Sequence, residues 1–318
     1  MNKETGLKLL PHGFKNFFDA SERSLLILEG NEGKDFLQRL STNDMSRLEI
    51  EGHAQTILTN EKGRIVEVLS VIMINPDRLF LVGQSRGTER LRTWLDKVII
   101  MEDARTLLPG NEWKHFIFFQ DEISMKLGEK QGGSMPLAWP DDLKSALNIP
   151  KDALLFQEQL GDTILLHLLL DPAQEKELLL QEQDPHLSRV EFERFRVLHG
   201  IPVSPNELSE LYNPLEANLG SLVNWTKGCY IGQEVIARLD TYKKVQKHLI
   251  NVQIGELPAF LPVKLSNKQG EAGILTSAVS LDDGRVVGLA YVGSGIPAES
   301  ELWFESDLRN VSVKRSPS

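Results

Sequence analysis

The sequence contains a single cysteine, Cys229, among its 318 residues. One cysteine excludes an internal disulfide framework and any zinc site built from several thiolates. It also means that one chain cannot supply the set of cysteines that normally holds an iron–sulfur cluster. Thiol chemistry in this chain must therefore use one sulfur, alone or together with ligands from another molecule.

Long apolar runs and an excess of positive charge are also missing. The most apolar stretch, residues 69–74, is far shorter than the ~20 residues that span a bilayer, and the first residues lack the apolar core of a signal peptide. The 35 Lys and Arg residues are outnumbered by 45 Asp and Glu residues, which gives a net charge of -10. This acidic balance argues against tight, non-specific nucleic-acid binding. We expect a soluble cytoplasmic protein with no membrane anchor and no direct nucleic-acid partner.

The first 240 residues mix strand and helix signals without a regular βαβ period, which predicts an α+β fold. Three strand-like runs joined by short turns predict an antiparallel meander, because parallel strands need long crossovers. The expected strands cover residues 23–29, 55–59, 64–74, 79–82, 114–119 and 163–170. The expected helices begin near residue 33 and cover 87–99, 172–183 and 188–199. Residues 131–142 are rich in Gly and Pro and predict a loop.

The last part of the chain changes character near Asp240. Five short strand-like runs are separated by turn residues, and no helix signal appears among them. The runs cover residues 247–255, 263–266, 273–279, 285–292 and 301–304. They predict a small antiparallel barrel or sandwich. We therefore expect two domains, residues 1–240 and residues 241–318.

The segment around Cys229 is the most informative for function. Ile231, Val235, Ile236 and Leu239 form an apolar stripe with helical spacing. This stripe predicts a helix over residues 233–239. Cys229 would lie on the loop before this helix or in its first turn. The helix N-terminus carries a partial positive charge, and Lys227 adds a cation, so both favour the thiolate over the thiol.

Two glycines, Gly228 and Gly232, flank the cysteine and permit close backbone approach. The arrangement suits a reactive thiol, a metal ligand or an anion-binding edge. The alternative is a packed structural cysteine, since free cysteines are often buried. Trp225 and Tyr230 could stack on a flat heterocycle or pack the loop down.

The octapeptide at residues 227–234, Lys-Gly-Cys-Tyr-Ile-Gly-Gln-Glu, closely resembles the Lys-Gly-Cys-Tyr-x-Gly-Gln-Glu signature of the YgfZ-type folate-binding proteins. These proteins are relatives of the glycine-cleavage aminomethyltransferase, the T-protein or GcvT. Residues 36–44, 58–65 and 196–202 are similar to further segments of that family. The resemblance therefore extends from about residue 20 to the predicted barrel.

The resemblance implies two interleaved ferredoxin-like modules, closed by the barrel around a central channel that holds tetrahydrofolate. It also implies a role in assembling or maintaining iron–sulfur enzymes, with a link to tRNA modification through such enzymes. Cys229 and Lys227 would carry the chemistry, and no bound metal is expected. The residues expected to hold the folate are Arg196, Gly228, Tyr230, Gln233 and Glu234.

One position departs from the aminomethyltransferases. Their hairpin carries an Asp-Asp pair, of which the second member is thought to act at the folate, whereas this sequence has Glu67 and Val68. Valine cannot accept a proton, and neighbouring residues on a strand point to opposite faces. We therefore favour a folate-binding accessory protein over two alternatives. One is a folate-dependent aminomethyltransferase or methylamine demethylase, and the other is an interaction module whose acidic surface binds a basic partner.

Overall fold

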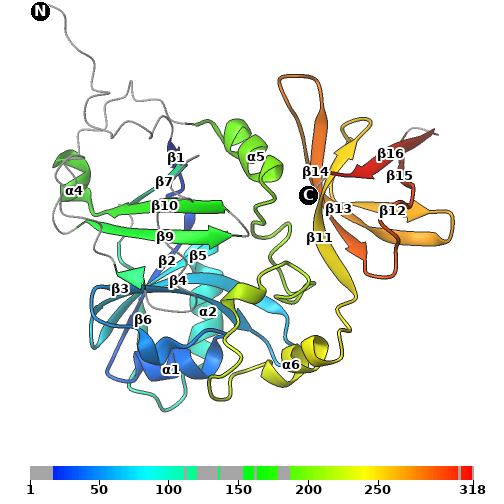
Figure 1. Cartoon of the computed structure of the whole chain (residues 1–318). Helices are drawn as coiled ribbons and strands as arrows, with labels where there is room; N and C mark the ends of the chain where they lie inside the picture. Colours follow the sequence, from blue (N-terminus) through cyan, green and yellow to red (C-terminus); the bar gives the residue numbers. More distant parts are fainter. Residues whose placement is uncertain are drawn as a thin grey trace, which may run out of the picture.

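The computed structural model describes residues 17–110, 113–119, 135–136, 153–160, 163–177, 187–306 and 309–316. The described chain forms two antiparallel sheets with helices and a closed barrel. In Figure 1 the two sheets lie on one side of the molecule and the barrel on the other, with the segment from α5 to α6 between them. The predicted α+β fold with a C-terminal antiparallel barrel is confirmed.

The larger sheet has six strands in the order β6-β2-β5-β4-β3-β8. Its strands are β2 (Arg23–Glu29), β3 (Gly52–Thr59), β4 (Ile65–Asn75), β5 (Arg78–Arg86), β6 (Arg105–Leu107) and β8 (Met135–Pro136). Strands β3, β4 and β5 pair antiparallel in succession, as the short turns predict. Helices α1 (Gly33–Leu40) and α2 (Thr88–Val98) pack on this sheet, because their apolar stripes, which include Phe36 and Leu95, share a core with β4.

The smaller sheet has four strands in the order β1-β7-β10-β9. Its strands are β1 (Phe17–Asp19), β7 (Lys114–Phe119), β9 (Leu154–Leu160) and β10 (Thr163–Leu170). The two sheets are interleaved along the chain, since β1 precedes the whole larger sheet and β8 joins that sheet from between β7 and β9. Within the loop expected over 131–142, only Met135 and Pro136 are described. These two residues form strand β8, because they pair with β3, so the expectation of a loop is wrong for them.

Helices α4 (Pro172–Glu177) and α5 (Arg189–Leu198) follow the smaller sheet. The helix expected over 172–183 is described only as far as Glu177, and the rest lies outside the described residues. Helix α5 begins with a capping box, in which Ser188 accepts from the Glu191 N–H and the Glu191 carboxylate accepts from the Ser188 N–H. A long irregular segment that contains one short 3₁₀ turn, η4 (Gly220–Leu222), leads from α5 to α6 (Gln233–Thr241). Another 3₁₀ turn, η2 (Met45–Arg47), lies between α1 and β3.

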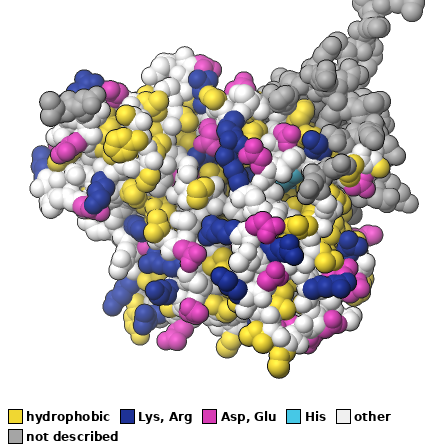
Figure 2. Space-filling model, turned by 180° about the vertical axis from the view of Figure 1, so that it is seen from behind, with side chains coloured by type: hydrophobic (Ala, Val, Ile, Leu, Met, Phe, Trp, Pro, Cys, Tyr) yellow, Lys and Arg dark blue, Asp and Glu magenta, His cyan; other side chains and the backbone are white. Residues whose placement is uncertain are grey.

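Six strands close the barrel in the order β11-β14-β13-β12-β15-β16. They are β11 (Lys247–Ile254), β12 (Val263–Asn267), β13 (Gly270–Ser280), β14 (Val286–Gly293), β15 (Leu302–Ser306) and β16 (Arg309–Arg315). One core cluster joins Val68 of β4, Leu165 of β10 and Leu289 of β14, so the barrel and both sheets share buried apolar contacts. Positive and negative side chains are interspersed over the rear face (Figure 2). No helix within the described ranges has the length and apolarity needed to cross a bilayer.

Candidate functional site

The cysteine loop, residues 224–232, leads from η4 into α6. It begins with a turn in which the Asn224 side-chain oxygen accepts the N–H groups of Thr226, at 2.9 Å, and of Lys227, at 3.0 Å. Helix α6 starts at Gln233, as the apolar stripe predicts, so Cys229 lies on the loop before it. Cys229 is a free and exposed cysteine, which excludes the alternative of a thiol sealed inside the core.

Lys227 anchors this loop to helix α1. Its ammonium donates to three backbone carbonyls, those of Gln38 at 2.8 Å, Ser41 at 2.7 Å and Asn43 at 2.7 Å. These carbonyls lie in the last turn of α1 and just after its C-terminal end, where a cation is favourable. Burial lowers the pKa of Lys227 to about 8. The sequence predicts a cation beside the thiol, but the three carbonyls direct this cation into the body of the protein.

The two glycines of the loop have different roles. Gly232 has φ 83° and ψ -2°, and a Cβ placed on it would lie 2.6 Å from the Asn60 carbonyl oxygen and 2.9 Å from Gly63 Cα. The start of α6 therefore packs directly on the turn between β3 and β4. A Cβ placed on Gly228 would meet nothing within 4 Å. Close backbone approach, predicted for both glycines, is found only at Gly232.

The remaining residues of the octapeptide lie on the same loop or on α6. Tyr230 is buried against Val223 and Ile236, and this burial raises its pKa to about 12. Its ring centroid lies 5.2 Å from the Lys227 ammonium, so the ring packs the loop down. Gln233 is half-buried, and Glu234 is exposed at the start of α6.

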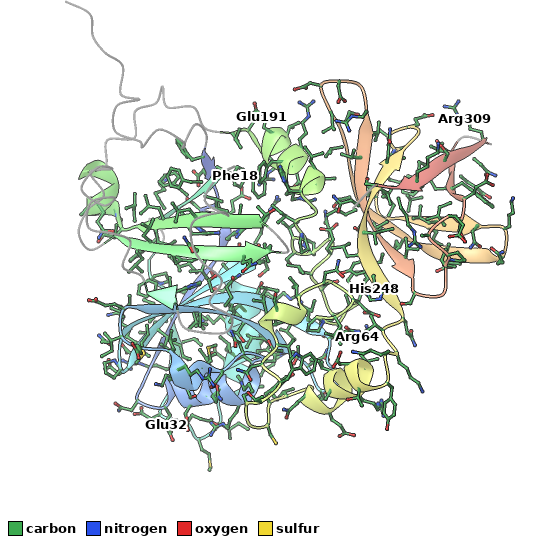
Figure 3. All side chains as sticks on the ribbon, in the orientation of Figure 1. Phe18, Glu32, Arg64, Glu191, His248 and Arg309 are labelled. Atoms are coloured by element: carbon green, nitrogen blue, oxygen red, sulfur yellow. The ribbon has the colours of Figure 1, made fainter. Side chains whose placement is uncertain are left out.

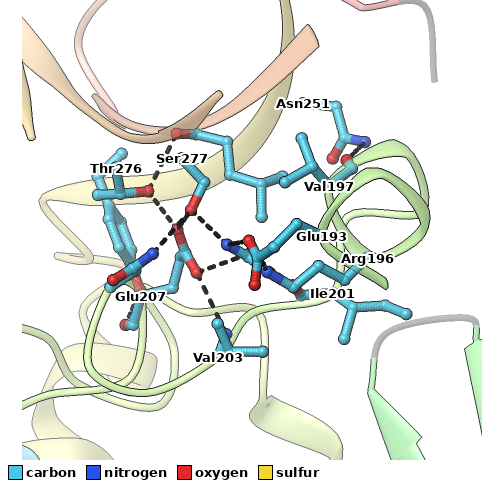
Figure 4. A network of polar contacts seen from close by, with 12 residues as sticks. Glu193, Arg196, Val197, Ile201, Val203, Glu207, Asn251, Thr276 and Ser277 are labelled. Atoms are coloured by element: carbon cyan, nitrogen blue, oxygen red, sulfur yellow. Dashed lines mark hydrogen bonds and ion pairs between the residues drawn. The ribbon is translucent and has the colours of Figure 1, made fainter. Parts of the chain in front are cut away.

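Arg196, the cation expected for a folate tail, lies in a buried network that joins α5 to the barrel (Figure 4). Its NH1 nitrogen lies 3.3 Å from the Glu207 carboxylate, and its Nε donates to Glu193 at 2.7 Å. Its NH2 nitrogen donates to Ser277 of β13 at 2.8 Å. Arg196 is completely buried. Its guanidinium is already neutralised by carboxylates of this chain.

The structure brings the octapeptide residues together but separates them from Arg196. Helix α5, which carries Arg196, and helix α6, which follows the cysteine loop, lie at opposite ends of the connecting segment (Figure 1). In Figure 3, Phe18 and Glu191 mark the end where β1 approaches α5, and Glu32 marks the opposite end beside α1. The predicted set of folate-binding residues therefore does not form one site.

A second candidate site, the arginine cleft, lies between the β1–β2 turn, the end of β5 and the start of α5. We define it by six of its lining residues, Phe18, Arg23, Gln84, Arg86, Arg189 and Phe192. About 470 Å³ of empty space lies in and in front of the cleft, and part of this volume is open solvent. The rings of Phe18 and Phe192 stack with their centroids 4.1 Å apart. No residue of the cysteine loop lines this cleft.

A layer of buried polar side chains lies behind the inner wall of the cleft and joins the two sheets. Glu158 of β9 accepts from Arg23, at 3.2 Å, and from the side-chain amide of Gln84. His167 Nε2 lies 3.3 Å from the same carboxylate, and its Nδ1 lies 2.8 Å from His115 Nε2. Burial alone would raise the pKa of Glu158, but His167 and the Arg23 guanidinium outweigh burial and lower it. The side-chain carbonyl oxygen of Gln84 is buried and has no hydrogen-bond partner in the part of the chain that the structure describes.

His53 of β3 lies in the same layer and is 3% exposed, with no partner for either ring nitrogen. Its ring centroid is 5.1 Å from that of Phe156. Burial lowers the pKa of His53 to about 3, so its ring is neutral at physiological pH. Buried polar atoms without partners are rare in native proteins and often face a water or ligand. No sequence motif indicates this layer, because its members come from strands far apart in the chain.

Glu67 and Val68 point in opposite directions, as their neighbouring positions on β4 predict. Val68 belongs to the apolar core shared with the barrel. The Glu67 carboxylate accepts the N–H groups of Gln84, at 2.9 Å, and Ser85, at 3.1 Å, as well as the Ser85 hydroxyl. Burial raises the pKa of Glu67. Glu67 therefore fills a structural position and does not replace the acid missing at Val68.

Among the described side chains, no group of three or more His, Cys, Asp or Glu is arranged to hold a metal ion. No family model matches the chain. Comparison with curated proteins finds the tRNA-modifying protein YgfZ of Enterobacter sp., 22% identical over 307 residues that cover 92% of this chain and 90% of that protein.

Two further relatives match shorter stretches. The mitochondrial iron-sulfur cluster assembly factor IBA57 of Homo sapiens is 31% identical over 177 residues, 52% of this chain and 46% of that protein. An aminomethyltransferase of Aquifex aeolicus is 25% identical over 243 residues, 75% of this chain and 64% of that protein. The chain therefore spans less than two thirds of the length of these two relatives.

Among solved structures, the glycine cleavage system aminomethyltransferase T of Bartonella henselae has a similar fold. The TM-score is 0.74 at 16% identity, and the match covers 96% of this chain and 86% of that one. The chain is thus related to the YgfZ-type proteins and shares its fold with the aminomethyltransferases. The predicted resemblance is confirmed.

Proposed function

We propose that this protein binds a reduced folate and acts as an accessory protein in the assembly or maintenance of iron–sulfur enzymes, with Cys229 as its reactive group. The observation that carries the proposal is that Cys229, the single cysteine of the sequence, is exposed on a loop that Lys227 fixes to α1. An exposed thiol just before a helix N-terminus suits transient ligation of a cluster together with a partner's ligands, or formation of an adduct. The cluster would be cargo, since one thiol cannot hold it alone.

The relatives support this assignment. One is named an iron-sulfur cluster assembly factor and another a tRNA-modifying protein. We infer that the partners of this chain are iron–sulfur enzymes or assembly proteins and that any effect on tRNA is indirect. The roles expected for Lys227 in the chemistry, and for Gly228, Tyr230, Gln233 and Glu234 in folate binding, stay predictions.

The fold shared with aminomethyltransferases supports tetrahydrofolate as the ligand, and we propose the arginine cleft as its place. The stacked Phe18 and Phe192 rings offer an apolar wall for the flat pterin. The unpartnered carbonyl oxygen of Gln84 is an acceptor for a pterin amino group. Arg196 is paired within the protein, so the carboxylates of the folate tail need another cation.

We also propose that residues 1–240 form the folate-binding module and that residues 241–318 form a separate barrel domain.

Two measurements test the two halves of the proposal. Calorimetric titration of tetrahydrofolate should show micromolar binding to the wild type and to Cys229→Ala, and weaker binding to Gln84→Leu. In cells that lack the protein, Cys229→Ala should fail to restore the activity of iron–sulfur enzymes, whereas Thr226→Ser, an exposed change on the same loop that keeps the hydroxyl, should restore it. Absence of folate binding would refute the folate half, and full rescue by Cys229→Ala would refute the thiol half.

The alternative function is an enzyme that transfers an aminomethyl group to tetrahydrofolate or demethylates a methylated amine. The shared aminomethyltransferase fold favours it, and the apolar surroundings of Val68 oppose it. An assay with a lipoyl-carried aminomethyl group or a methylglycine substrate decides the question. Folate-dependent formaldehyde or methylene transfer would establish the enzyme.

A further inference from the structure

The mouth of the arginine cleft holds two guanidinium groups that share one carboxylate oxygen. Oε2 of Glu22 lies 2.5 Å from Arg189 NH2 and 3.6 Å from Arg86 Nε. The three side chains are exposed by 64%, 50% and 56% respectively, so water reaches all of them. Exposed ion pairs of this kind contribute little to stability and exchange readily with other anions.

The backbone around these side chains is fixed, although the side chains are not. Arg189 is the first residue of the capped helix α5, and Arg86 is the last residue of β5. The Glu22 carbonyl accepts the Gly87 N–H at 3.0 Å, and the Arg23 N–H donates to Ala20 at 2.8 Å. The two arginines are therefore presented at a constant separation, while the Glu22 side chain can swing away.

Two other charged groups of the cleft are paired elsewhere, Arg23 with the buried Glu158 and Glu193 with Arg196. Asp19 keeps its negative charge, and its carboxylate accepts the Ser21 N–H at 2.9 Å. Among the described residues, Glu22 is the carboxylate that forms ion pairs with Arg86 and Arg189, so moving it away leaves both guanidinium groups without a close counter-charge.

We propose that Arg86 and Arg189 form a carboxylate-binding site for the glutamyl tail of the folate, and that Glu22 occupies this site until the ligand displaces it. The inference rests on the folate binding proposed above. A folate whose pterin lies against the inner wall, beside Gln84 and Phe192, directs its tail outward to this mouth. Glu22 then acts as a competing carboxylate that weakens binding of tailed folates and leaves tail-less pterins unaffected.

The test compares two probes, tetrahydrofolate and tetrahydrobiopterin, a reduced pterin without a glutamyl tail, by calorimetry. Glu22→Gln should tighten tetrahydrofolate binding by about threefold to tenfold, and Arg189→Gln should weaken it by a similar factor. Neither variant should change the affinity for tetrahydrobiopterin. Binding of tetrahydrofolate to the wild type should also weaken as salt is raised from 50 to 300 mM.

Glu301→Gln is the matched control, because it removes the same charge from an exposed ion pair with Lys268 on the barrel, and it should leave tetrahydrofolate binding unchanged. Equal tetrahydrofolate affinities for the wild type, Glu22→Gln and Arg189→Gln would overturn the inference while leaving folate binding intact. An equal gain in Glu301→Gln would also overturn it, since the effect would then come from net charge. Failure of the wild type to bind tetrahydrofolate would instead refute the proposed function.

Discussion

At the scale of single residues, Lys227 shows how a buried cation can hold a reactive loop in place. Replacing it in Lys227→Met keeps most of the stem but leaves the carbonyls of Gln38, Ser41 and Asn43 without their shared donor. An unsatisfied buried group costs about 1–3 kcal/mol, and only the contact with Ser41 is fully buried, so we expect a loss of roughly 2–3 kcal/mol in the free energy of unfolding. Urea denaturation measures it. Lys62→Met, an exposed lysine, is the control, and equal stability of the two variants would contradict the anchoring role.

His53 makes the stability depend on pH. Its pKa is lowered by burial from 6.5 to about 3, so the unfolded chain binds a proton in this interval and the folded chain does not. The stabilising effect of the neutral ring is complete above pH 6.5 and is lost as the pH falls toward 3. At pH 5 the loss is about 2 kcal/mol. In urea denaturation at pH 7 and pH 5, His53→Phe should remove this part of the pH dependence, and the exposed His248→Phe should not. An unchanged pH dependence in His53→Phe would contradict the prediction.

At the scale of elements, the junction between the cysteine loop and α6 depends on one glycine. Gly232→Ala places a Cβ at 2.6 Å from the Asn60 carbonyl and in a left-handed conformation, so we expect a loss of about 2–4 kcal/mol. Gly228→Ala, four positions earlier and with open space around it, should change stability by less than about 0.5 kcal/mol. Thermal or urea unfolding of both variants measures the contrast. Similar losses in the free energy of unfolding for Gly232→Ala and Gly228→Ala would contradict the prediction, because the close contact at Gly232 would then not explain its loss.

Most elements can be predicted from the sequence, and the exceptions have a common cause. Strands with a clear apolar pattern, such as β2 and β10, are predicted with their bounds. Strand β9 is not, because Gln157 and Glu158 interrupt its apolar pattern, although Glu158 is buried by partners on the other sheet. Strand β16 is missed because only Val311 and Val313 turn inward among polar residues. In each case burial depends on contacts distant in the sequence.

The same limit applies to the candidate sites. The position of Cys229 before α6 follows from a local helical pattern, so it can be predicted. The partners of Lys227 lie 184–189 positions away in the sequence, and Arg196 reaches Ser277 81 positions away. No local sequence pattern reveals such pairings. From the sequence alone, Lys227 and Arg196 are therefore predicted to act on a ligand, although both are paired within the protein. The arginine cleft is built wholly from such contacts and was not predicted.

At the scale of the whole molecule, the Arg196–Glu207 pair links the body to the barrel through its hydrogen bonds to Thr276 and Ser277 of β13. Removing the cation in Arg196→Met leaves a buried, unpaired carboxylate, which costs about 3–5 kcal/mol. Adding Glu207→Gln should recover part of this loss, because a neutral amide needs no counter-charge. Urea denaturation of the single and double variants measures both effects. A double variant no more stable than Arg196→Met would show that the ion pair itself contributes little.

The presence of only one cysteine in the 318-residue sequence has a consequence for oxidative damage. An exposed thiolate that meets peroxide becomes a sulfenic acid, and proteins commonly rescue that state with a neighbouring thiol that closes a disulfide. This chain has no such resolving cysteine. Recovery of an oxidised Cys229 must therefore come from outside the chain, for example from a small-molecule thiol. Under the function proposed above, over-oxidation to the sulfinic acid would inactivate the molecule irreversibly.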